Sequence, residues 1–545
     1  IAKWMESVAY LVEKGPMPEL EKVVEATIDE IERHQDGNGY VNSYFTAIEP
    51  SQRWTRRWAH ELYCAGHLIE AAVAWRHATG RDRFLKIMCR YADYIDRVFR
   101  REGSARFSTP GHEEIELALV KLYHATGEEK YLALSRHFID MRGRNAETEG
   151  EAEWQKRANQ SHLPCVEQDT AEGHAVRAGY LFSGMADIAR ECGDEALKAA
   201  CEKLFDSIAL RRMYITGGVG STHNQEAFTV DYDLPNETAY TETCAAIALA
   251  YFAGRLLLME PDAKYADVVE RVLYNGFLAG TSLDGKHFFY SNPLEITLSR
   301  REHPSSERGD WLPATQRVEV FSCSCCPPNV TRFVASVGDF MLTEDDGTVF
   351  VHQYMNAAAK AGPARIGVET DYPRHGVIRV RAEGLGGRRL ALRIPGWCDR
   401  FGLNVPYAME RGYACIAPAD AADVTLTLDM APRLVEANPN AADCAGRAAV
   451  MRGPVVYCLE GVDNGERLHG ILLDPRGALA EAGSFGGLPV ISAKGWQRPS
   501  PEGNWLYRPY AARYEEKALT FIPYYAFANR GESDMRVWVP VKTTW

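Results

Sequence analysis

PELEKVVEATIDEIERH, residues 18–34, shows the pattern that the chain follows up to about residue 341. Its apolar residues, among them Val24, Ile28 and Ile31, recur at steps of three or four, the period of a helix that buries one face. The next stretch, QDGNGY at residues 35–40, contains two glycines and ends this period. Because a helix with one apolar face must be covered by another helix, the segment predicts a helical domain.

Segments with the same period continue along the N-terminal part of the chain. They predict further helices at residues 2–14, 57–78, 82–100, 112–125, 130–141, 172–191, 195–210, 238–260, 264–278 and 329–342. Two segments end in the same tetrapeptide, HATG, at residues 77–80 and 124–127, with glycine where a left-handed cap residue would lie. The recurrence of helix pairs predicts a closed ring of αα-hairpins with a cup at one end.

From about residue 342 the sequence changes to short β-branched or alternating runs separated by Gly, Pro and Asp. These runs predict strands at residues 349–351, 365–370, 377–382, 389–394 and 424–428, and a second β-rich segment from residue 448 to residue 541. We therefore predict a multidomain α and β protein, with a helical catalytic domain at 1–341, a β-sandwich at 342–437 and a C-terminal β-sandwich at 438–545.

The charge balance limits the partners that the protein can have. It has 61 basic and 74 acidic residues, a net charge of −13, which argues against nucleic acid or an anionic membrane surface and favours neutral molecules such as sugars. No apolar run is long enough to span a bilayer, and no signal peptide is visible. The composition is compatible with a homodimer.

Cysteine usage favours a reducing compartment. The 13 cysteines are odd in number and form no regular framework, as expected of reduced thiols in a cytoplasmic protein with a metal or catalytic cluster. The chain starts at Ile1, already inside a predicted helix, so we expect that an N-terminal part is missing and that a lost signal peptide is compatible with the sequence.

Two short stretches predict a metal site. Glu242-Thr243-Cys244 and, about eighty residues on, Cys323-Ser324-Cys325-Cys326-Pro327-Pro328 supply one carboxylate and several thiolates. Glu242, Cys244, Cys325 and Cys326 have the number and type of ligands that tetrahedral Zn²⁺ takes. A purely structural zinc site is one interpretation. The carboxylate ligand favours a functional one, because closed structural sites are usually built from Cys and His.

The predicted position of two thiols favours their reactivity. Proline suits the first turn of a helix, so Pro327 and Pro328 would place Cys325 and Cys326 at a helix N-terminus, where the helix dipole lowers a thiol pKa. A metal would lower it further. Cys325 or Cys326 is therefore a candidate nucleophile as well as a ligand.

Other polar residues are candidates for the same cup. Glu226 lies sixteen residues before Glu242, although a loop carboxylate is usually just solvated. Three histidines lie near the starts or glycine breaks of predicted helices: His60, His112 and His174. Tyr290 could offer a ring face and a hydroxyl to the same cup. Each histidine could instead be a packed core residue, and Tyr290 could be a core aromatic.

Several motifs together resemble glycoside hydrolase family 127, the β-L-arabinofuranosidases. The similar stretches are EAF at 226–228, YDLPN at 232–236, YTETCA at 240–245, HELYCAGH at 60–67, PGH at 110–112, GHAVR at 173–177, NPLE at 292–295 and CCPPN at 325–329. They are spread over nearly all of the helical part. The β-rich part matches through NRG at 529–531 and VWVP at 537–540, a weaker signal.

The resemblance implies an (α/α)6 barrel followed by β-sandwich domains, and Zn²⁺ held by Glu242, Cys244, Cys325 and Cys326. It implies that Cys325 is the nucleophile and Glu226 the general acid/base. His60, His112, His174 and Tyr290 match positions that contact the sugar. Family members normally begin before the position of Ile1, and that earlier part supplies barrel structure and a substrate-binding glutamine.

The expected function is therefore retaining exo-hydrolysis that releases a terminal β-L-arabinofuranose or a closely related furanoside from a small carbohydrate, such as a plant-glycan fragment. One alternative is a sugar epimerase or lyase on a helical barrel that uses the paired histidines His112 and His174, with zinc only structural. Another is a non-catalytic carbohydrate-binding protein. The exact sugar and linkage are left open by these residues.

Overall fold

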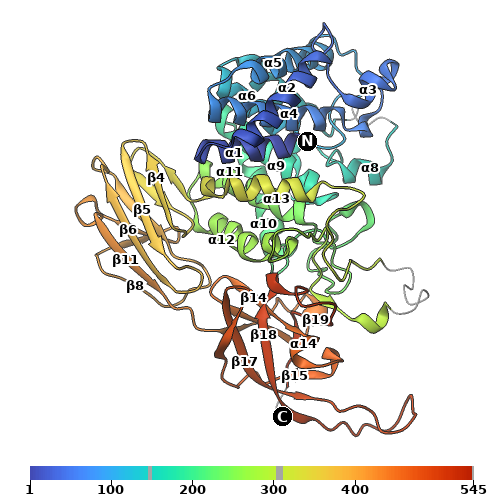
Figure 1. Cartoon of the computed structure of the whole chain (residues 1–545), viewed down its shortest axis with the longest axis vertical. Helices are drawn as coiled ribbons and strands as arrows, with labels where there is room; N and C mark the ends of the chain where they lie inside the picture. Colours follow the sequence, from blue (N-terminus) through green and yellow to red (C-terminus); the bar gives the residue numbers. More distant parts are fainter. Residues whose placement is uncertain (145–149, 302–310, 543–545) are drawn as a thin grey trace.

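The computed structural model describes residues 1–144, 150–301 and 311–542. It consists of a helical domain and two β-rich regions that follow it in the chain (Figure 1). This confirms the predicted order of a helical domain and β-rich regions. Within the described residues no helix has the length and apolar character that a bilayer crossing needs.

In the described part of the helical domain, six helices contact one another in a ring, and the last of them returns to the first. They are α1 (Ala2–Lys14), α4 (Glu61–Thr79), α6 (Ile115–Thr126), α9 (Ala175–Cys192), α11 (Thr243–Met259) and α13 (Cys326–Ala335). An outer helix packs on each of the first five: α2 (Pro18–Arg33), α5 (Arg83–Asp96), α7 (Glu129–Met141), α10 (Glu195–Arg211) and α12 (Ala263–Arg271). The pairs of helices therefore form the predicted ring.

A buried ionic cluster joins the inner helices. Arg332 on α13 is 2% exposed and donates to Glu6 on α1 at 2.9 Å and to Glu70 on α4 at 2.8 Å. It also donates to the Tyr180 hydroxyl on α9 at 3.0 Å, while Lys121 on α6 donates to Glu70 at 2.5 Å. Buried charges are tolerated only when they are paired and hydrogen-bonded, so this cluster holds five inner helices in one arrangement.

The helix boundaries differ from the prediction where they form the cup. The expected helix 57–78 begins at Glu61, because His60 has the left-handed φ of 61°. The expected helix 112–125 begins at Ile115, which leaves His112 in the preceding loop. There Gly111 approaches the backbone so closely that a Cβ would lie 2.7 Å from the Arg57 carbonyl oxygen. The two histidine-bearing loops therefore pack directly on each other.

The first β-rich region contains two five-stranded sheets around one core. One sheet has the order β4 (Ala357–Ala361), β5 (Ala364–Thr370), β6 (Val377–Glu383), β11 (Asp423–Leu428), β8 (Phe401–Leu403). The other has the order β2 (Leu342–Glu344), β3 (Thr348–Val351), β7 (Arg389–Arg393), β10 (Tyr413–Ile416), β9 (Ala408–Glu410). Burial alternates along β6, as expected of a strand with one face on the core.

The strands of the C-terminal region join into one ten-stranded sheet, where the sequence predicted a second sandwich. Its main path is β1 (Glu295–Ile296), β19 (Met535–Arg536), β14 (Val455–Glu460), β18 (Glu515–Pro523), β17 (Leu488–Gln497), β15 (Ile471–Leu473), with β12 (Arg433–Val435), β13 (Arg447–Arg452), β16 (Ala480–Phe485) and β20 (Val539–Pro540) branching from it. The helical part contributes β1, so the sheet extends across the predicted domain boundary.

This sheet braces a loop of the helical domain. The hydroxyl of Tyr524 donates to the carbonyl oxygens of Asn292 at 3.1 Å and Pro293 at 2.9 Å, just after Tyr290 in the chain. Phe289, beside Tyr290, stacks on Phe527 with ring centroids 5.3 Å apart. The C-terminal region therefore fixes the segment that carries one of the predicted site residues.

Candidate active site

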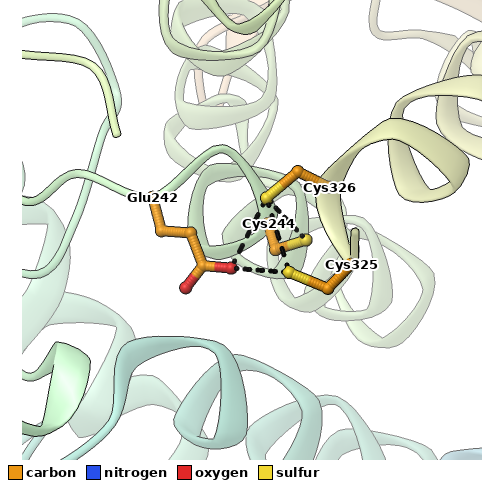
Figure 2. A group of neighbouring side chains, drawn as sticks. All are labelled: Glu242, Cys244, Cys325 and Cys326. Atoms are coloured by element: carbon orange, nitrogen blue, oxygen red, sulfur yellow. Dashed lines mark hydrogen bonds between the residues drawn. The ribbon is translucent and has the colours of Figure 1, made fainter. Parts of the chain in front are cut away.

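Four predicted metal ligands lie together at one end of the ring (Figure 2). The Sγ atoms of Cys244 and Cys326 are 3.4 Å apart, and those of Cys325 and Cys326 are 3.6 Å apart. Glu242 Oε1 lies 3.5 Å from Cys325 Sγ and 3.6 Å from Cys326 Sγ. Residues eighty positions apart in the sequence thus form one compact cluster.

The cluster has the dimensions of a tetrahedral metal site. Thiolates that lie about 2.3 Å from a tetrahedral Zn²⁺ are separated by about 3.8 Å. The distances given above are close to this value, and all four ligand atoms lie within 4.8 Å of one another. Glu242 Oε2 is buried and has no hydrogen-bond partner among the described residues. The three sulfurs and one oxygen are also the soft and borderline donors that suit zinc. The residues therefore fit a metal ion.

Two helix N-termini meet at the cluster. Cys325 is the N-cap of α13 and Cys326 its first residue, as the prolines predicted. Glu242 is the N-cap of α11, and Cys244 lies in its first turn. The prediction placed the start of this helix at residue 238, so it missed the second N-terminus. Both helix dipoles direct their positive ends at the four ligands, which favours the deprotonated forms of thiols and carboxylates.

The ionisation of the ligands follows their surroundings. Burial raises the pKa of Glu242 well above its usual range, and the neighbouring Cys325 raises it further. Burial alone would also raise the pKa of Cys244, but its hydrogen bonds with Cys325 and Cys326 lower it to about 5. A thiolate is thus favoured inside the cluster, while Lys3, the cation that acts on Glu242, does not offset the effect of burial on its pKa.

Glu226 lies beside the cluster, and two donors hold its carboxylate. His174 Nε2 is 2.7 Å from Glu226 Oε2, and the Tyr240 hydroxyl donates to Oε1 at 2.8 Å. Burial opposes the charge of Glu226, but these hydrogen bonds, led by that of His174, lower its pKa below the usual value. Atoms of His174, Glu226 and Glu242 lie within 4.8 Å of one another, so the carboxylate adjoins the candidate metal site.

The tautomer of His174 follows from its other nitrogen. His174 is the N-cap of α9, and its Nδ1 accepts a hydrogen bond from the Val176 N–H at 3.2 Å. In the neutral ring the proton is therefore on Nε2, which donates it toward Glu226. The helix start orients the histidine, and the histidine orients the carboxylate.

The three candidate histidines come together although they are far apart in sequence. The ring centroids of His60 and His112 are 5.6 Å apart, and those of His112 and His174 are also 5.6 Å apart. Burial lowers the pKa of all three, which favours neutral imidazoles that can exchange hydrogen bonds with hydroxyl groups. The backbone carbonyl groups of Trp58 and Glu113 lie within hydrogen-bond distance of Nδ1 of His60 and His112, respectively.

Tyr290 completes the predicted set. Its hydroxyl oxygen lies 3.5 Å from Cys325 Sγ, and its backbone carbonyl accepts from Thr243 N at 2.9 Å. Burial raises its pKa, so the phenol remains a neutral donor beside the sulfur. These residues line a cavity of about 460 Å³, while Cys326 lies behind the cavity wall. The cavity is lined by Lys3, His60, Tyr63, His112, His174, Val176, Arg177, His223, Gln225, Glu226, Glu242, Cys244, Tyr290, Cys323 and Cys325.

Some residues at the site escaped the sequence-based prediction. Tyr240 and Arg177 lie inside motifs that were recognised, but nothing in those motifs indicated a hydrogen bond to Glu226 or a place in the cavity. Tyr63 packs against His112, with ring centroids 4.4 Å apart, and could have been noted from the motif at residues 60–67. Lys3 reaches the cavity from α1 and carried no signal in the sequence.

Family models match both ends of the chain. The model described as β-L-arabinofuranosidase, GH127 catalytic domain, matches residues 1–339, and the glycoside hydrolase family 127 C-terminal domain matches residues 432–540. The chain belongs to glycoside hydrolase family 127. The GH127 catalytic model spans the helical ring and every candidate site residue.

Similar GH127 proteins cover almost the whole chain. The chain is 37% identical to the non-reducing end β-L-arabinofuranosidase of Bifidobacterium longum subsp. longum over 98% of its length and 88% of the relative. The crystal structure of a GH127 β-L-arabinofuranosidase from Geobacillus stearothermophilus T6 superimposes with a TM-score of 0.94 at 44% identity, covering 99% of this chain and 90% of that one. Another GH127 β-arabinofuranosidase structure gives a TM-score of 0.87 at 36% identity, covering 99% and 87%.

These findings confirm the predicted family and the predicted enzyme class, a glycosidase acting on a carbohydrate. They do not support the epimerase or lyase alternative, or a non-catalytic binding protein, since the GH127 relatives are named as arabinofuranosidases. For the metal, the structure contributes a Glu/Cys cluster that could hold an ion.

Proposed function

We propose that this GH127 member releases a terminal β-L-arabinofuranose, with retention of configuration, through the Cys325 thiolate and the Glu226 carboxyl group. The observation that carries the proposal is that Cys325 Sγ and Glu226 line the same cavity, which also contains the three neutral histidines. The names of the similar GH127 proteins support the choice of sugar.

We assign the four-ligand cluster to Zn²⁺, held by Glu242, Cys244, Cys325 and Cys326. When bound, the ion would keep the ligand sulfurs deprotonated at neutral pH and hold them in place. This would supply a charge partner for the buried carboxylate of Glu242, whose Oε2 has no partner among the described residues.

The first step uses two groups of the protein. Glu226, protonated, gives its proton to the oxygen of the leaving group. Cys325 Sγ attacks the anomeric carbon, so that a C–S bond forms as the C–O bond breaks and the leaving group departs as an alcohol. The Tyr290 hydroxyl oxygen lies 3.5 Å from Cys325 Sγ, where it would donate a hydrogen bond to the sulfur once that is a thiolate.

The second step reverses these roles. Glu226, now a carboxylate, takes a proton from water, whose oxygen attacks the anomeric carbon and displaces the sulfur of Cys325. Two displacements at one carbon retain its configuration. His60, His112 and His174 would bind the hydroxyl groups of the sugar, because neutral imidazoles can both donate and accept.

A panel of aryl glycosides tests the proposal. Wild-type protein is expected to hydrolyse the β-anomer of an aryl L-arabinofuranoside faster than the α-anomer or an arabinopyranoside, and a chelator should abolish the activity. Cys325→Ser and Glu226→Gln should each lose at least about 10³-fold in kcat/KM. Full activity of Cys325→Ser would exclude the covalent step, and absence of turnover on any furanoside would exclude the proposed substrate.

A further inference from the structure

Arg177 is a cationic side chain in the cavity that has no hydrogen-bond or ion-pair partner among the described residues. It lies in the first turn of α9, three residues after His174, and lines the cavity. In the described part of the chain its guanidinium makes no hydrogen bond or ion pair, and its Nε is buried without a partner. Removing a guanidinium from bulk water costs free energy unless its N–H groups find acceptors. This position therefore suits a ligand that supplies hydrogen-bond acceptors.

The arginines near Arg177 have acceptors within the protein. Arg57 donates to Glu151 at 2.8 Å and to the Thr109 carbonyl at 3.0 Å. Arg142 forms an ion pair with Glu113 at 2.7 Å. The carboxylates of Glu113 and Glu226 act on Arg177 through space, but neither is bonded to it. Arg177 therefore differs from the structural arginines around it.

An indole ring holds Arg177 in place. Its Cζ lies 4.8 Å from the ring centroid of Trp58, whose carbonyl oxygen is 2.8 Å from His60 Nδ1. A guanidinium that packs on an aromatic ring keeps its N–H groups available for bonds along its edges. The stack thus presents a fixed fork of donors, which matches two oxygen acceptors on one ligand.

Arg177 and Glu226 line the same cavity, and the start of α9 carries both Arg177 and His174, the hydrogen-bond partner of Glu226. Lys3 and Cys323 line the cavity near the sulfur cluster, and Lys3 is under the electrostatic influence of Cys244 and Cys325. The carboxylates that act on Arg177 are those of Glu113 and Glu226, and Glu226 is the residue that must protonate the departing oxygen. A general acid lies within hydrogen-bond reach of the leaving-group oxygen, so the leaving group is bound on the Glu226 side.

We propose that Arg177, held by Trp58, binds the leaving group and selects leaving groups that carry paired oxygen acceptors, either vicinal hydroxyl groups of a second sugar or a carboxylate. The inference rests on the proposed hydrolysis of β-L-arabinofuranosides and adds the recognition of the other half of the substrate. It makes Arg177 a specificity-determining residue.

Three substrates with the same arabinofuranosyl group separate this role from others. They are phenyl β-L-arabinofuranoside, carboxyphenyl β-L-arabinofuranoside and a disaccharide in which β-L-arabinofuranose is linked to a second sugar. For each substrate, kcat/KM is measured for wild type and for Arg177→Met, which keeps a side chain of similar length but has no donors. The ratio of wild type to variant cancels differences in leaving-group reactivity.

We expect a loss of about 10-fold or more on the disaccharide, on the carboxyphenyl substrate or on both, and a loss of less than about 3-fold on the phenyl substrate. Loss on the disaccharide alone identifies sugar hydroxyl groups as the acceptors, and loss on the carboxyphenyl substrate alone identifies a carboxylate. Equal losses on all three substrates, or no loss on any, would overturn the inference.

Matched variants keep the result interpretable. Arg177→Lys, which keeps the charge but not the fork of donors, should lose part of the preference for leaving groups with paired oxygen acceptors. Trp58→Leu should weaken the same preference. Arg190→Met changes an arginine of the same helix that pairs with Glu191 away from the cavity, and should change no ratio. Wild-type turnover of the phenyl substrate tests the proposed function separately. If wild type cleaves none of the three, the proposed function fails and the inference with it.

Discussion

His174 and Glu226 form a hydrogen-bonded pair, with His174 Nε2 2.7 Å from Glu226 Oε2, at the edge of the candidate metal cluster. The pair couples the N-terminus of α9 to the residue that we propose as the acid/base. Because the histidine and Tyr240 both stabilise the charged carboxylate, they set the pH range in which Glu226 can give a proton.

Tyr240→Phe should move the alkaline limb of kcat/KM to higher pH. The variant removes the donor to Glu226 Oε1, so the Glu226 pKa rises, and a general acid that must be protonated then stays active to higher pH. Loss of one hydrogen bond to a charged group corresponds to a shift of about one pH unit. The pH profile of kcat/KM on an aryl glycoside measures it.

Tyr214→Phe is the matched control for this prediction. Tyr214 is also buried, and its hydroxyl donates to the Pro235 carbonyl at 3.1 Å, outside the cavity lining. Its profile should coincide with that of wild type. An alkaline limb that stays in place or moves to lower pH in Tyr240→Phe would contradict the role of Glu226 as the acid.

Cys244→Ala should lose the bound metal. The variant removes one of the four proposed ligands, at the start of α11, so the remaining three would hold the ion more weakly. Metal content per chain, measured by elemental analysis after dialysis, should fall from about one zinc to near zero. Cys201→Ala, a buried thiol on α10 outside the cluster, should keep the full content. Equal zinc in both variants would show that the ion binds elsewhere.

Arg332→Met should destabilise the helical domain. The change leaves Glu6 and Glu70 buried with one cation fewer, and breaking a buried ionic cluster from one side typically costs about 3–5 kcal/mol. Urea unfolding followed by far-UV circular dichroism measures this free energy. Arg389→Met, which breaks an exposed pair with Glu410, should cost no more than about 1 kcal/mol. Similar losses in the two variants would mean that the cluster does not hold the ring together.

Local sequence patterns predicted the parts of the structure that depend on neighbouring residues. The glycines at positions 80 and 127 are left-handed caps, as their HATG context indicated, and the prolines after Cys326 mark the start of α13. These features follow from backbone preferences that one short segment determines.

Contacts between distant segments could not be predicted in the same way. Glu6 and Arg332 are 326 positions apart, and no periodicity relates them. The strand at Glu295–Ile296 pairs with Met535–Arg536 of the C-terminal sheet, and so crosses the domain boundary that composition predicted. The unpaired state of Arg177 is likewise a property of the folded cavity alone. Burial and pairing of this kind depend on the three-dimensional packing.

The covalent step can be observed if the second half of the reaction is slowed. In Glu226→Ala an aryl arabinofuranoside with a good leaving group needs no acid for the first displacement, but water then lacks its general base. The thioglycosyl enzyme should therefore accumulate. Mass spectrometry of the protein and of its peptides should show an added pentosyl group on the peptide that contains Cys325.

The double variant Glu226→Ala/Cys325→Ser provides the matched control, because it lacks both the base and the sulfur. It should form no adduct under the same conditions. An adduct on Glu242, or a pentosyl group on any peptide of the double variant, would assign the nucleophile to another residue. An adduct confined to Cys325 would mean that the sulfur 3.5 Å from Glu242 Oε1 attacks the sugar.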